Sequence, residues 1–478
     1  MTTINSRATA ISKFAGDGTS ITFLANDMVV EVEPISAIKE PERETRKITD
    51  RAVSTAEAIL NQCGQVAPII VQDDGTIIAG LEFFRAARKL GWKSIKIVRL
   101  SALSKEHARV LTIALARLPE LSSWEPDALR LEFNDLLSID LGFDLHDLTG
   151  FTIGEMDVIL EGDDPGDNPD PLDEVPDVPE EESIVTQPGD IWQLGEHRII
   201  CGNSLDAATY VRLMAEKVAR MVLVDPPYNV AIENNVSGLG KKKHKNFAMA
   251  VGEMNFAQFT VFLKTMLLHS ARHLTDGGLL YVFMDRRKLE ELHVAGREAG
   301  LSLFDLAVWN KMSGAMGSFY RSQLEICLIF KNGTAPHLNN IELGKHGRYR
   351  TNVWDHRGFS SFGKERGEAL KQHPTQKPVN LLAETIKDCS KRGEIVLDSF
   401  LGSGSTIIAA EKSGRVGYGV ELEPKYVDVC IKRFEKMTGK EAVHEATGLT
   451  FAQLGSRRLR QPALRQQSNE HQPEVTGQ

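Results

Sequence analysis

Residues 395–406, with the sequence IVLDSFLGSGST, decide the fold of this 478-residue chain. A short apolar run ends at Asp398, and a Gly402-x-Gly404 turn leads to a predicted helix that begins at Ser405. Apolar runs that end in Asp and turn-forming residues are typical of buried strands in an α/β sheet, whose loops meet ligands at the carboxyl edge. We therefore predict an α/β domain with a ligand-binding loop at this point.

The surroundings of this loop suit an adenosine-containing ligand. Glycines let the backbone approach a ligand closely, and the hydroxyl groups and N–H donors around Ser405 suit a carboxylate. A second predicted strand, residues 416–420, ends at Glu421, which stands 23 residues after Asp398. A carboxylate at that spacing can accept hydrogen bonds from both hydroxyls of a ribose. The pattern leaves a nicotinamide cofactor and S-adenosylmethionine as alternatives.

A second loop, Asp225-Pro226-Pro227-Tyr228, follows another apolar run and is predicted at the same edge of the sheet. Two prolines stiffen the loop, so the Asp225 side chain and the Pro226 carbonyl become fixed acceptors, and the Tyr228 ring can stack on a base. The amino group of a nucleobase is a poor nucleophile, and acceptors on its hydrogens stabilise the positive charge that develops as a methyl group arrives. Because a stacked base cannot present this group, the nucleotide must flip out. This loop therefore favours methyl transfer, and S-adenosylmethionine over a nicotinamide.

Residues 188–455 resemble the DNA amino-methyltransferases of the permuted β group, in which DPPY precedes an FxGxG motif. The matching motifs are Asp225-Pro226-Pro227-Tyr228, His373-Pro374-Thr375-Gln376-Lys377-Pro378, Asp398 with Phe400-Leu401-Gly402-Ser403-Gly404-Ser405-Thr406, and Glu421. The resemblance implies a Rossmann-like domain that uses S-adenosylmethionine, with Phe400 at the adenosine and Glu421 on the ribose. Relatives often carry Gly-Asp near the adenine, where this chain has Gly202-Asn203. Asn203 keeps an acceptor oxygen and is a further candidate.

The resemblance also implies methylation of adenine at its exocyclic nitrogen in double-stranded DNA, since cytosine enzymes of this group more often carry Ser in place of Asp. Three alternatives stay open: a cytosine-N4 methyltransferase, a methylase of RNA or of a protein amide, and a non-catalytic DNA-binding protein with a vestigial methylase half. The predicted catalytic residues are Asp225, Pro226, Pro227 and Tyr228. The predicted cofactor-binding residues are Asn203, Lys377, Asp398, Phe400, Gly402, Ser403, Gly404, Ser405, Thr406 and Glu421.

The first 160 residues predict a small α+β domain, with strands at 67–71, 76–80 and 94–100. It resembles the ParB-like N-terminal domain through Ala67-Pro68-Ile69-Ile70-Val71, Asp74-Gly75, Ile78-Ala79-Gly80, Arg85-Ala86-Ala87 and Leu90-Gly91. In active relatives, paired basic residues after the Gly grip phosphates, but here Arg85 alone remains after Leu81, Glu82, Phe83 and Phe84. Since phosphate binding needs donors or cations, we expect a DNA-docking or assembly module rather than a nucleotide hydrolase or nuclease. A domain kept only for folding and dimerisation is the alternative.

Between the two domains, residues 161–182 hold eleven acidic residues, five prolines and no basic residue. Like charges repel and proline forbids helix, so this composition predicts an extended, solvated linker. The net charge of the chain is −9 and would be +2 without these acids, so the charge does not exclude a nucleic-acid partner. The predicted organisation is a ParB-like domain at 1–160, a linker at 161–187, a methyltransferase domain at 188–455 and a disordered tail at 456–478. This layout resembles the DNA modification methylases carried by phages and prophages.

Two further stretches predict contacts with DNA. Residues 309–368 mix basic, aromatic and amide side chains, which suits target recognition. Their basic residues include Lys311, Arg321, Lys331, Lys345, Arg348, Arg350 and Arg357. Lys241-Lys242-Lys243-His244-Lys245 lies shortly after the catalytic loop and predicts a clamp on phosphates.

The composition argues against a membrane or secreted protein. No apolar run approaches the roughly 20 residues that a membrane span needs, and residues 1–13 lack the layout of a signal peptide. We therefore predict a cytoplasmic location. The five cysteines are widely spaced and include no CxxC pair, which predicts reduced thiols rather than a disulfide framework or a metal site. A homodimer stays open beside a monomer.

Overall fold

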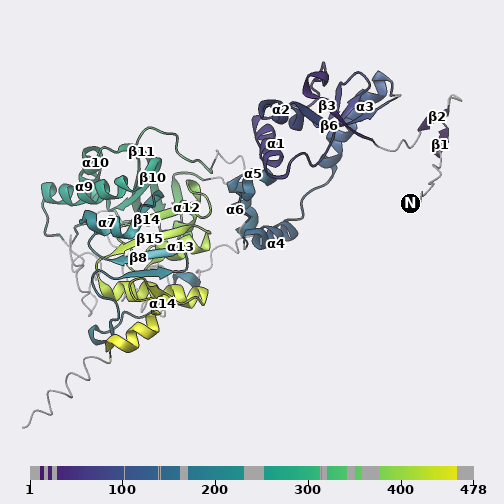
Figure 1. The fold of residues 1–478 in the computed structure, drawn as a ribbon. Helices are drawn as coiled ribbons and strands as arrows, with labels where there is room; N and C mark the ends of the chain where they lie inside the picture. The colour runs from purple at the N-terminus through teal and green to yellow at the C-terminus, as the bar shows by residue number, and fades with distance from the viewer. Residues whose placement is uncertain are drawn as a thin grey trace, which may run out of the picture. The chain divides into compact units, whose positions relative to one another are not determined.

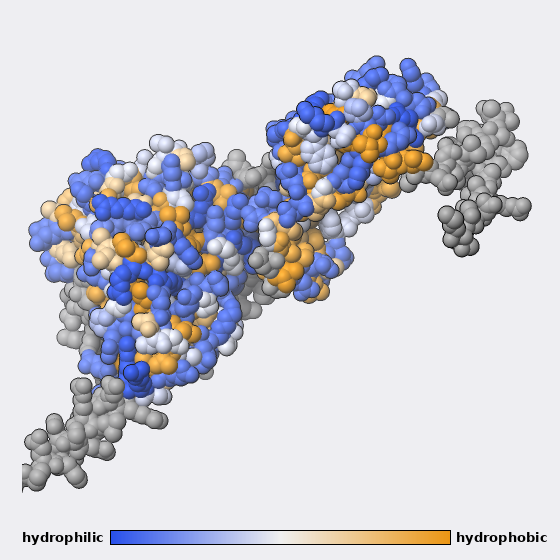
Figure 2. All heavy atoms as spheres, in the orientation of Figure 1, coloured by the Kyte–Doolittle hydropathy of each residue, from blue (hydrophilic) through white to orange (hydrophobic). Residues whose placement is uncertain are grey.

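The computed structural model describes residues 11–14, 20–23, 29–101, 103–137, 139, 141–161, 171–230, 252–312, 314, 320–341, 350–357 and 376–459. The chain divides into two compact units, Met1–Thr152 and Ile153–Gln478, each with its own sheet and core (Figure 1). Hydrophobic side chains are scattered among hydrophilic ones on the face seen in Figure 2. Among the helices of the described residues, we find none whose length and apolar content would carry it through a bilayer.

The first unit contains the predicted α+β fold. Its four-stranded sheet has the order β3-β6-β4-β5, and the apolar faces of α1 and α2 pack on it. Asp74 closes the turn between β4 and β5, since its Oδ1 accepts the N–H of Thr76 at 3.0 Å. The elements of this unit are β1 (Ile11–Phe14), β2 (Ser20–Phe23), β3 (Val30–Pro34), α1 (Asp50–Cys63), β4 (Ile69–Gln72), β5 (Ile77–Ala79), α2 (Leu81–Lys89), β6 (Ser94–Leu100), α3 (Lys105–Arg117), α4 (Pro126–Leu137) and α5 (Leu145–Thr149).

In this unit, Arg85 is held by the unit's own acids. Its guanidinium donates from Nε to Glu40 Oε2 at 3.0 Å and pairs with Glu44 as well. Arg88 pairs with the other oxygen of Glu40 at 2.8 Å. A phosphate would have to displace these carboxylates in order to bind Arg85.

The second unit is built on a ten-stranded mixed sheet of the order β13-β11-β12-β10-β9-β14-β15-β8-β7-β16. The central strands β10, β9, β14, β15 and β8 run parallel, while β12 and β7 pair antiparallel with their neighbours. The strands are β7 (Ile191–Leu194), β8 (His197–Cys201), β9 (Ala219–Val224), β10 (Leu274–Met284), β11 (Ser302–Asn310), β12 (Leu324–Lys331), β13 (Val353–Asp355), β14 (Ile395–Asp398), β15 (Val416–Glu421) and β16 (Val443–His444). The predicted α/β, Rossmann-like class is confirmed.

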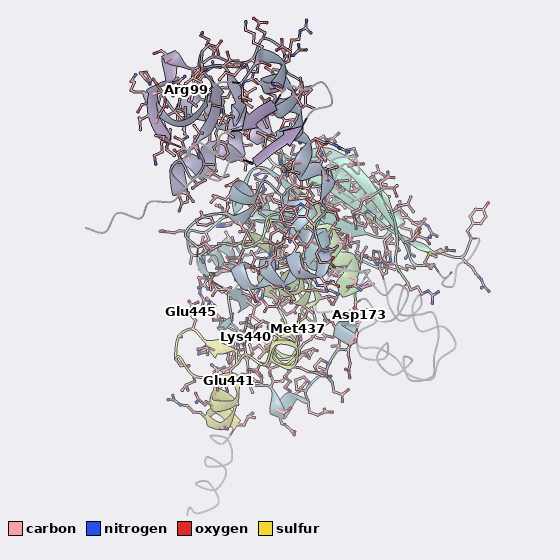
Figure 3. The ribbon with its side chains drawn as sticks, turned by 90° about the vertical axis from the view of Figure 1, so that its right-hand side faces the viewer. Arg99, Asp173, Met437, Lys440, Glu441 and Glu445 are labelled. Carbon is pink, nitrogen blue, oxygen red and sulfur yellow. The ribbon has the colours of Figure 1, made fainter. Side chains whose placement is uncertain are left out.

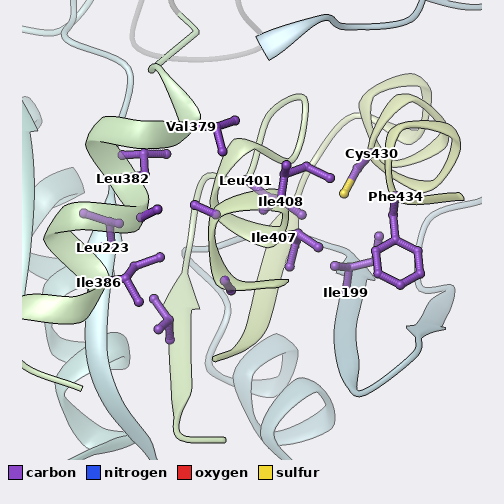
Figure 4. Close-up of a cluster of buried hydrophobic side chains, with 14 of the residues drawn as sticks. Ile199, Leu223, Val379, Leu382, Ile386, Leu401, Ile407, Ile408, Cys430 and Phe434 are labelled. Carbon is purple, nitrogen blue, oxygen red and sulfur yellow. The ribbon is translucent and has the colours of Figure 1, made fainter. Parts of the chain in front are cut away.

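Helices cover both faces of this sheet. Successive side chains of a strand point to opposite faces, so Leu223 of β9 packs in one core and Val222 and Val224 in the other. The first core lies under α12 (Val379–Asp388), α13 (Ser405–Lys412) and α14 (Pro424–Thr438), as Figure 4 shows in close-up. The second lies under α7 (Ala207–Met214), α9 (Phe256–Arg272) and α10 (Leu289–Glu298). With both faces covered, the central strands can be apolar throughout.

The two predicted loops leave the sheet at the same edge. Strands β9 and β14 are parallel neighbours, with Met221 opposite Val396 and Val222 opposite Leu397. From here β9 leads to β10 on one side, and β14 leads to β15 on the other. Such a switch point opens a crevice outside the carboxyl ends of the strands. The prediction that both loops share one edge is confirmed.

The predicted solvated linker packs on the rest of the second unit at residues 172–174 and 185–186, while residues 180–183 between them are exposed. Val379 donates its N–H to the Asp173 carboxylate at 2.8 Å, at the start of α12. The carbonyl of Leu172 accepts from Arg433 at 2.7 Å, and the buried Asp428 accepts the N–H groups of Val185 and Thr186. Acidic residues here satisfy backbone donors, which composition alone does not reveal. Two short 3-10 turns, Pro171–Asp173 and Glu181–Ser183, lie in this segment, and Figure 3 labels Asp173.

The structure also moves the boundary between the units from residue 160 to residue 152. Helix α6 (Ile153–Glu161) belongs to the second unit, because Asp157 forms a buried ion pair with Arg415 at 2.9 Å. At the other end, residues 456–459 of the predicted disordered tail are helical, and Arg458 pairs with Asp190. Residues 162–170 of the linker and 460–478 of the tail lie outside the described residues.

Replacing Asp173 tests whether the end of the linker is docked. Asp173→Ala removes the carboxylate that accepts the first N–H of α12, so we expect the free energy of unfolding of the second unit to fall by about 1 kcal/mol. Urea unfolding followed by circular dichroism measures this. Glu180→Ala changes an exposed acid of the same segment and serves as the control. Equal stability of both variants would contradict the docked arrangement.

Candidate active site

A cavity of about 290 Å³ opens at the carboxyl edge, between the loops that follow β9, β14 and β15. It is lined by every predicted site residue except Asn203 and Gly404. The predicted residues in its wall are Asp225, Pro226, Pro227, Tyr228, Lys377, Asp398, Phe400, Gly402, Ser403, Ser405, Thr406 and Glu421. The tertiary structure thus brings together segments that are almost 200 residues apart.

The turn after β14 is held by Asp398. Its carboxylate accepts the N–H of Phe400 at 2.9 Å with one oxygen and the hydroxyl of Thr406 at 2.6 Å with the other. Gly404, with a φ of +86°, caps helix α13, and a Cβ at this position would overlap Cys430. Ser405 and Thr406, at the start of α13, line the cavity, and the N-terminus of a helix favours an anionic group.

Glu421 closes the other side of this turn. One of its oxygens accepts the N–H of Gly402 and the other accepts the N–H of Glu423, each at 2.8 Å. A carboxylate oxygen has a second lone pair, so Glu421 can still accept from a ligand hydroxyl. Burial raises the pKa of Glu421 to about 7 and the pKa of Asp398 to about 7.

The loop predicted to be catalytic carries a charged cluster. Tyr228 donates its hydroxyl to Asp225 Oδ1, and Lys377 donates Nζ to Asp225 Oδ2. Lys377 Nζ also lies 3.1 Å from Glu325 Oε2 and 3.2 Å from the Tyr228 hydroxyl. Lys377, predicted to bind the cofactor, thus contacts the predicted catalytic carboxylate directly. The ring of Phe283 lies beneath the same ammonium, 5.1 Å from its centroid.

Burial and charge act against each other in this cluster. Burial raises the pKa of Asp225 and of Tyr228. Burial also disfavours the charged form of Lys377, but Asp225 and Glu325 outweigh it and raise the pKa of Lys377. For Glu325, burial is outweighed by Lys377 and Lys311, which hold its pKa at about 2. Lys377 is therefore a cation bound between two carboxylates.

The sequence analysis missed Glu325 and the wall formed by residues after β15. Glu325 stands near the start of β12, whose other residues are apolar up to Lys331, and an isolated acid in such a run is the signal that could have identified it. Leu422, Glu423, Lys425 and Tyr426 follow β15 at the same edge and line the cavity. Any residue directly after a parallel strand at a switch point is a candidate of this kind.

Several predicted residues lie elsewhere. The side chain of Asn203 accepts the N–H of Leu205 at 2.9 Å, although its neighbours Gly202 and Ser204 line the cavity. In the proposed recognition region, Lys311 pairs with Glu325 and Arg350 pairs with Asp388 at 3.0 Å, so both are engaged within the unit. Residues 241–245, 342–349, 358–375 and most of 313–319 lie outside the described residues, including the phosphate clamp and His373.

Comparison with known proteins gives the family of each part. Residues 219–432 match the family model of DNA methylases of the N6/N4 type, and residues 127–188 match a ParB-methyltransferase HTH domain. The chain is similar to the type II methyltransferase M.HpaI of Haemophilus parainfluenzae, with 23% identity over 265 residues, covering 52% of this chain and 78% of that protein. It is similar to the type II methyltransferase M2.DpnII of Streptococcus pneumoniae, with 25% identity over 242 residues, covering 48% of this chain and 87% of that protein.

Among solved structures, the M1.HpyAVI–SAM complex matches with a TM-score of 0.36 and 20% identity, covering 49% of this chain and 98% of that chain. A score this low adds nothing to the fold described above. The DNA methylase model, in contrast, covers the loop that holds Asp225 and all of the cavity lining except Gly202 and Ser204. This chain therefore contains a DNA methylase domain of the N6/N4 type together with a ParB-methyltransferase helix-turn-helix domain.

Proposed function

We propose that this protein transfers a methyl group from S-adenosylmethionine to the exocyclic amino group of adenine in double-stranded DNA. The observation that carries this proposal is the position of Asp225. It follows β9 directly and faces a cavity whose other wall is formed by the loops after β14 and β15. The acceptor proposed for the amino group and the cavity proposed to bind the adenosine are thus adjacent.

The cavity has the donors and acceptors that S-adenosylmethionine requires. Glu421 can accept from the ribose hydroxyls, and the N–H groups at the start of α13 can bind the carboxylate of the methionine end. Phe400 and Tyr426 offer flat apolar walls for the adenine. When bound, this cofactor supplies an electrophilic methyl group on a sulfonium.

The residues of the chain then act on the flipped base. Asp225 and the Pro226 carbonyl accept the hydrogens of the amino group, which keeps its lone pair available and stabilises the positive charge on nitrogen. The Tyr228 hydroxyl is bonded to Asp225, so its ring is held at a fixed place beside the acceptor.

The choice of adenine is supported by the Asp at position 225, which in the β group accompanies adenine more often than cytosine. The family model covers both N6 and N4 methylation, so the base must be measured. We propose that the N-terminal unit and the helix-turn-helix segment dock on DNA. A DNA substrate agrees with the cytoplasmic location predicted from the sequence.

Incubation with labelled S-adenosylmethionine and double-stranded DNA tests the function. Mass spectrometry of the digested product should show N6-methyladenine, and single-molecule sequencing of DNA from an expressing host should give the target sequence. N4-methylcytosine in place of N6-methyladenine would identify the alternative enzyme. Label in RNA or protein but not in DNA would overturn the proposal.

The raised pKa values predict how cofactor binding depends on pH. Below pH 7, Glu421 and Asp398 take up protons and lose acceptor lone pairs, so binding should weaken as the pH falls. With a pKa of about 7, roughly a tenth of the Glu421 carboxylate remains ionised at a pH of about 6, so the loss of this one acceptor should raise the dissociation constant at least about 10-fold from a pH of about 8. Calorimetry measures this. Glu421→Gln should bind more weakly with a flatter pH dependence, and equal pH dependence in both proteins would contradict the role of Glu421.

A further inference from the structure

The ammonium of Lys377 has one acceptor for each of its three N–H groups. These acceptors are Asp225 Oδ2, Glu325 Oε2 at 3.1 Å and the Tyr228 hydroxyl at 3.2 Å. The side chain of Lys377 is 5% exposed. Lys377 lies in the segment before α12, while its acceptors lie in the loop after β9 and in β12, so only the folded chain brings them together.

In this arrangement Asp225 already holds a donor on each oxygen, Tyr228 on Oδ1 and Lys377 on Oδ2. Each oxygen keeps a second lone pair, so the amino group of the target base can still bind Asp225, but it must share the carboxylate with Lys377. A lysine cation on the same carboxylate also opposes the positive charge that develops on the amino nitrogen. Lys377 must therefore loosen its bond to Asp225 before methyl transfer.

Glu325 lowers the free-energy cost of releasing Lys377 from Asp225. A buried ammonium that loses its carboxylate partner is strongly destabilised. Glu325 Oε2 lies within 3.1 Å of Lys377, so the ammonium stays paired after it leaves Asp225. Lys311 binds Glu325 through Oε1, which leaves Oε2 directed at Lys377 and Tyr228.

We propose that Glu325 is a positioning residue that takes over Lys377 when the target amino group reaches Asp225. The proposal rests on the proposed function. In the reaction, the lone pair of the amino nitrogen forms a bond to the methyl carbon, and the bond from carbon to sulfur breaks with its electrons left on sulfur. The nitrogen then gives a proton to the Asp225 carboxylate. Glu325 touches none of the reacting atoms and acts through Lys377.

Glu325→Gln tests this role, because it keeps the shape of the side chain and removes its charge. Among the described residues, Asp225 then remains as the carboxylate bonded to Lys377. We expect kcat to fall about 10- to 100-fold, while the dissociation constant for S-adenosylmethionine and the KM for DNA change less than about 3-fold. Glu325→Asp keeps the charge and should recover part of the loss. Glu298→Gln removes an exposed, ion-paired carboxylate on α10 and is the matched control.

A pH profile separates this role from a merely structural one. In the Gln variant, the loss of a neighbouring negative charge and the tighter hold of Lys377 both favour the ionised form of Asp225. The acid limb of kcat should therefore move to lower pH. The titratable groups that face Asp225 are Tyr228 on its own loop, Lys377 before α12, Glu325 and Cys327 on β12, and Asp398 on β14.

A Gln variant as fast as the wild type would overturn the inference, and so would a loss of cofactor affinity equal to the loss of kcat. If Glu325→Gln does not fold, Lys311→Met provides the second test. It removes the lysine that binds Oε1 and so directs Oε2 of Glu325 at Lys377. Because Glu325 is then less well placed to take over Lys377, kcat should fall about 3- to 10-fold with cofactor affinity unchanged. An unchanged kcat would count against the inference. A wild-type protein that binds cofactor but methylates no DNA would instead overturn the proposed function itself.

Discussion

Asp225→Ala should lower the rate of methyl transfer about 10³-fold and change the dissociation constant for S-adenosylmethionine less than about 3-fold. The reason is geometric. Asp225 lies at the end of β9, while the groups assigned to the cofactor lie on the loops after β14 and β15. Removing its carboxylate takes away the acceptor for the amino group and leaves the loops after β14 and β15 intact. Single-turnover methylation assays and calorimetry on the same preparation measure the two quantities.

Asp225→Asn is the matched variant, because it keeps the shape and one acceptor oxygen but removes the charge. We expect a loss of rate between those of the wild type and the Ala variant. In both variants Glu325 keeps Lys377 paired at 3.1 Å, so the second unit should stay folded. Equal loss of rate and cofactor affinity would show that Asp225 builds the cavity and does not act on the base.

Gly404→Ala should lower the free energy of unfolding of the second unit by about 3 kcal/mol and weaken cofactor binding. Gly404 has a φ of +86°, a conformation that L side chains rarely adopt. A Cβ at this position would also overlap the Sγ of Cys430 and lie 2.9 Å from the Cβ of Cys430. Because Cys430 is buried in α14, neither helix can yield without a shift of the binding turn.

Gly402→Ala separates the conformational cost of a side chain at positive φ from the cost of the steric clash with Cys430. Gly402 also has a positive φ, +55°, but a Cβ there meets no atom within 4 Å. It should therefore cost about 1 kcal/mol, the conformational part alone. Urea unfolding of both variants tests this, and equal destabilisation would show that the contact with Cys430 is unimportant.

Much of the site could be predicted because its parts are short and local. A strand, a Gly turn, a helix and a terminal acid follow one another within residues 395–421, and each is recognisable from neighbouring residues. At the linker, the structure differs from the prediction. Its acidic residues repel one another where they are neighbours along the chain. The Asp173 carboxylate, however, accepts a backbone N–H that lies more than 200 residues away in the sequence. Composition reports charge and says nothing about distant partners.

By itself, the sequence determined the α/β class, the two loops and the residue types that face the cavity, since these depend on periodicity and on the chemistry of adjacent residues. Only the tertiary structure decided which charges meet. Asp225, Glu325 and Lys377 come from three separate segments, and their pairing depends on the order of the strands in the sheet. Electrostatic interactions fall off over a few ångströms in space, and spacing along a chain does not record such distances.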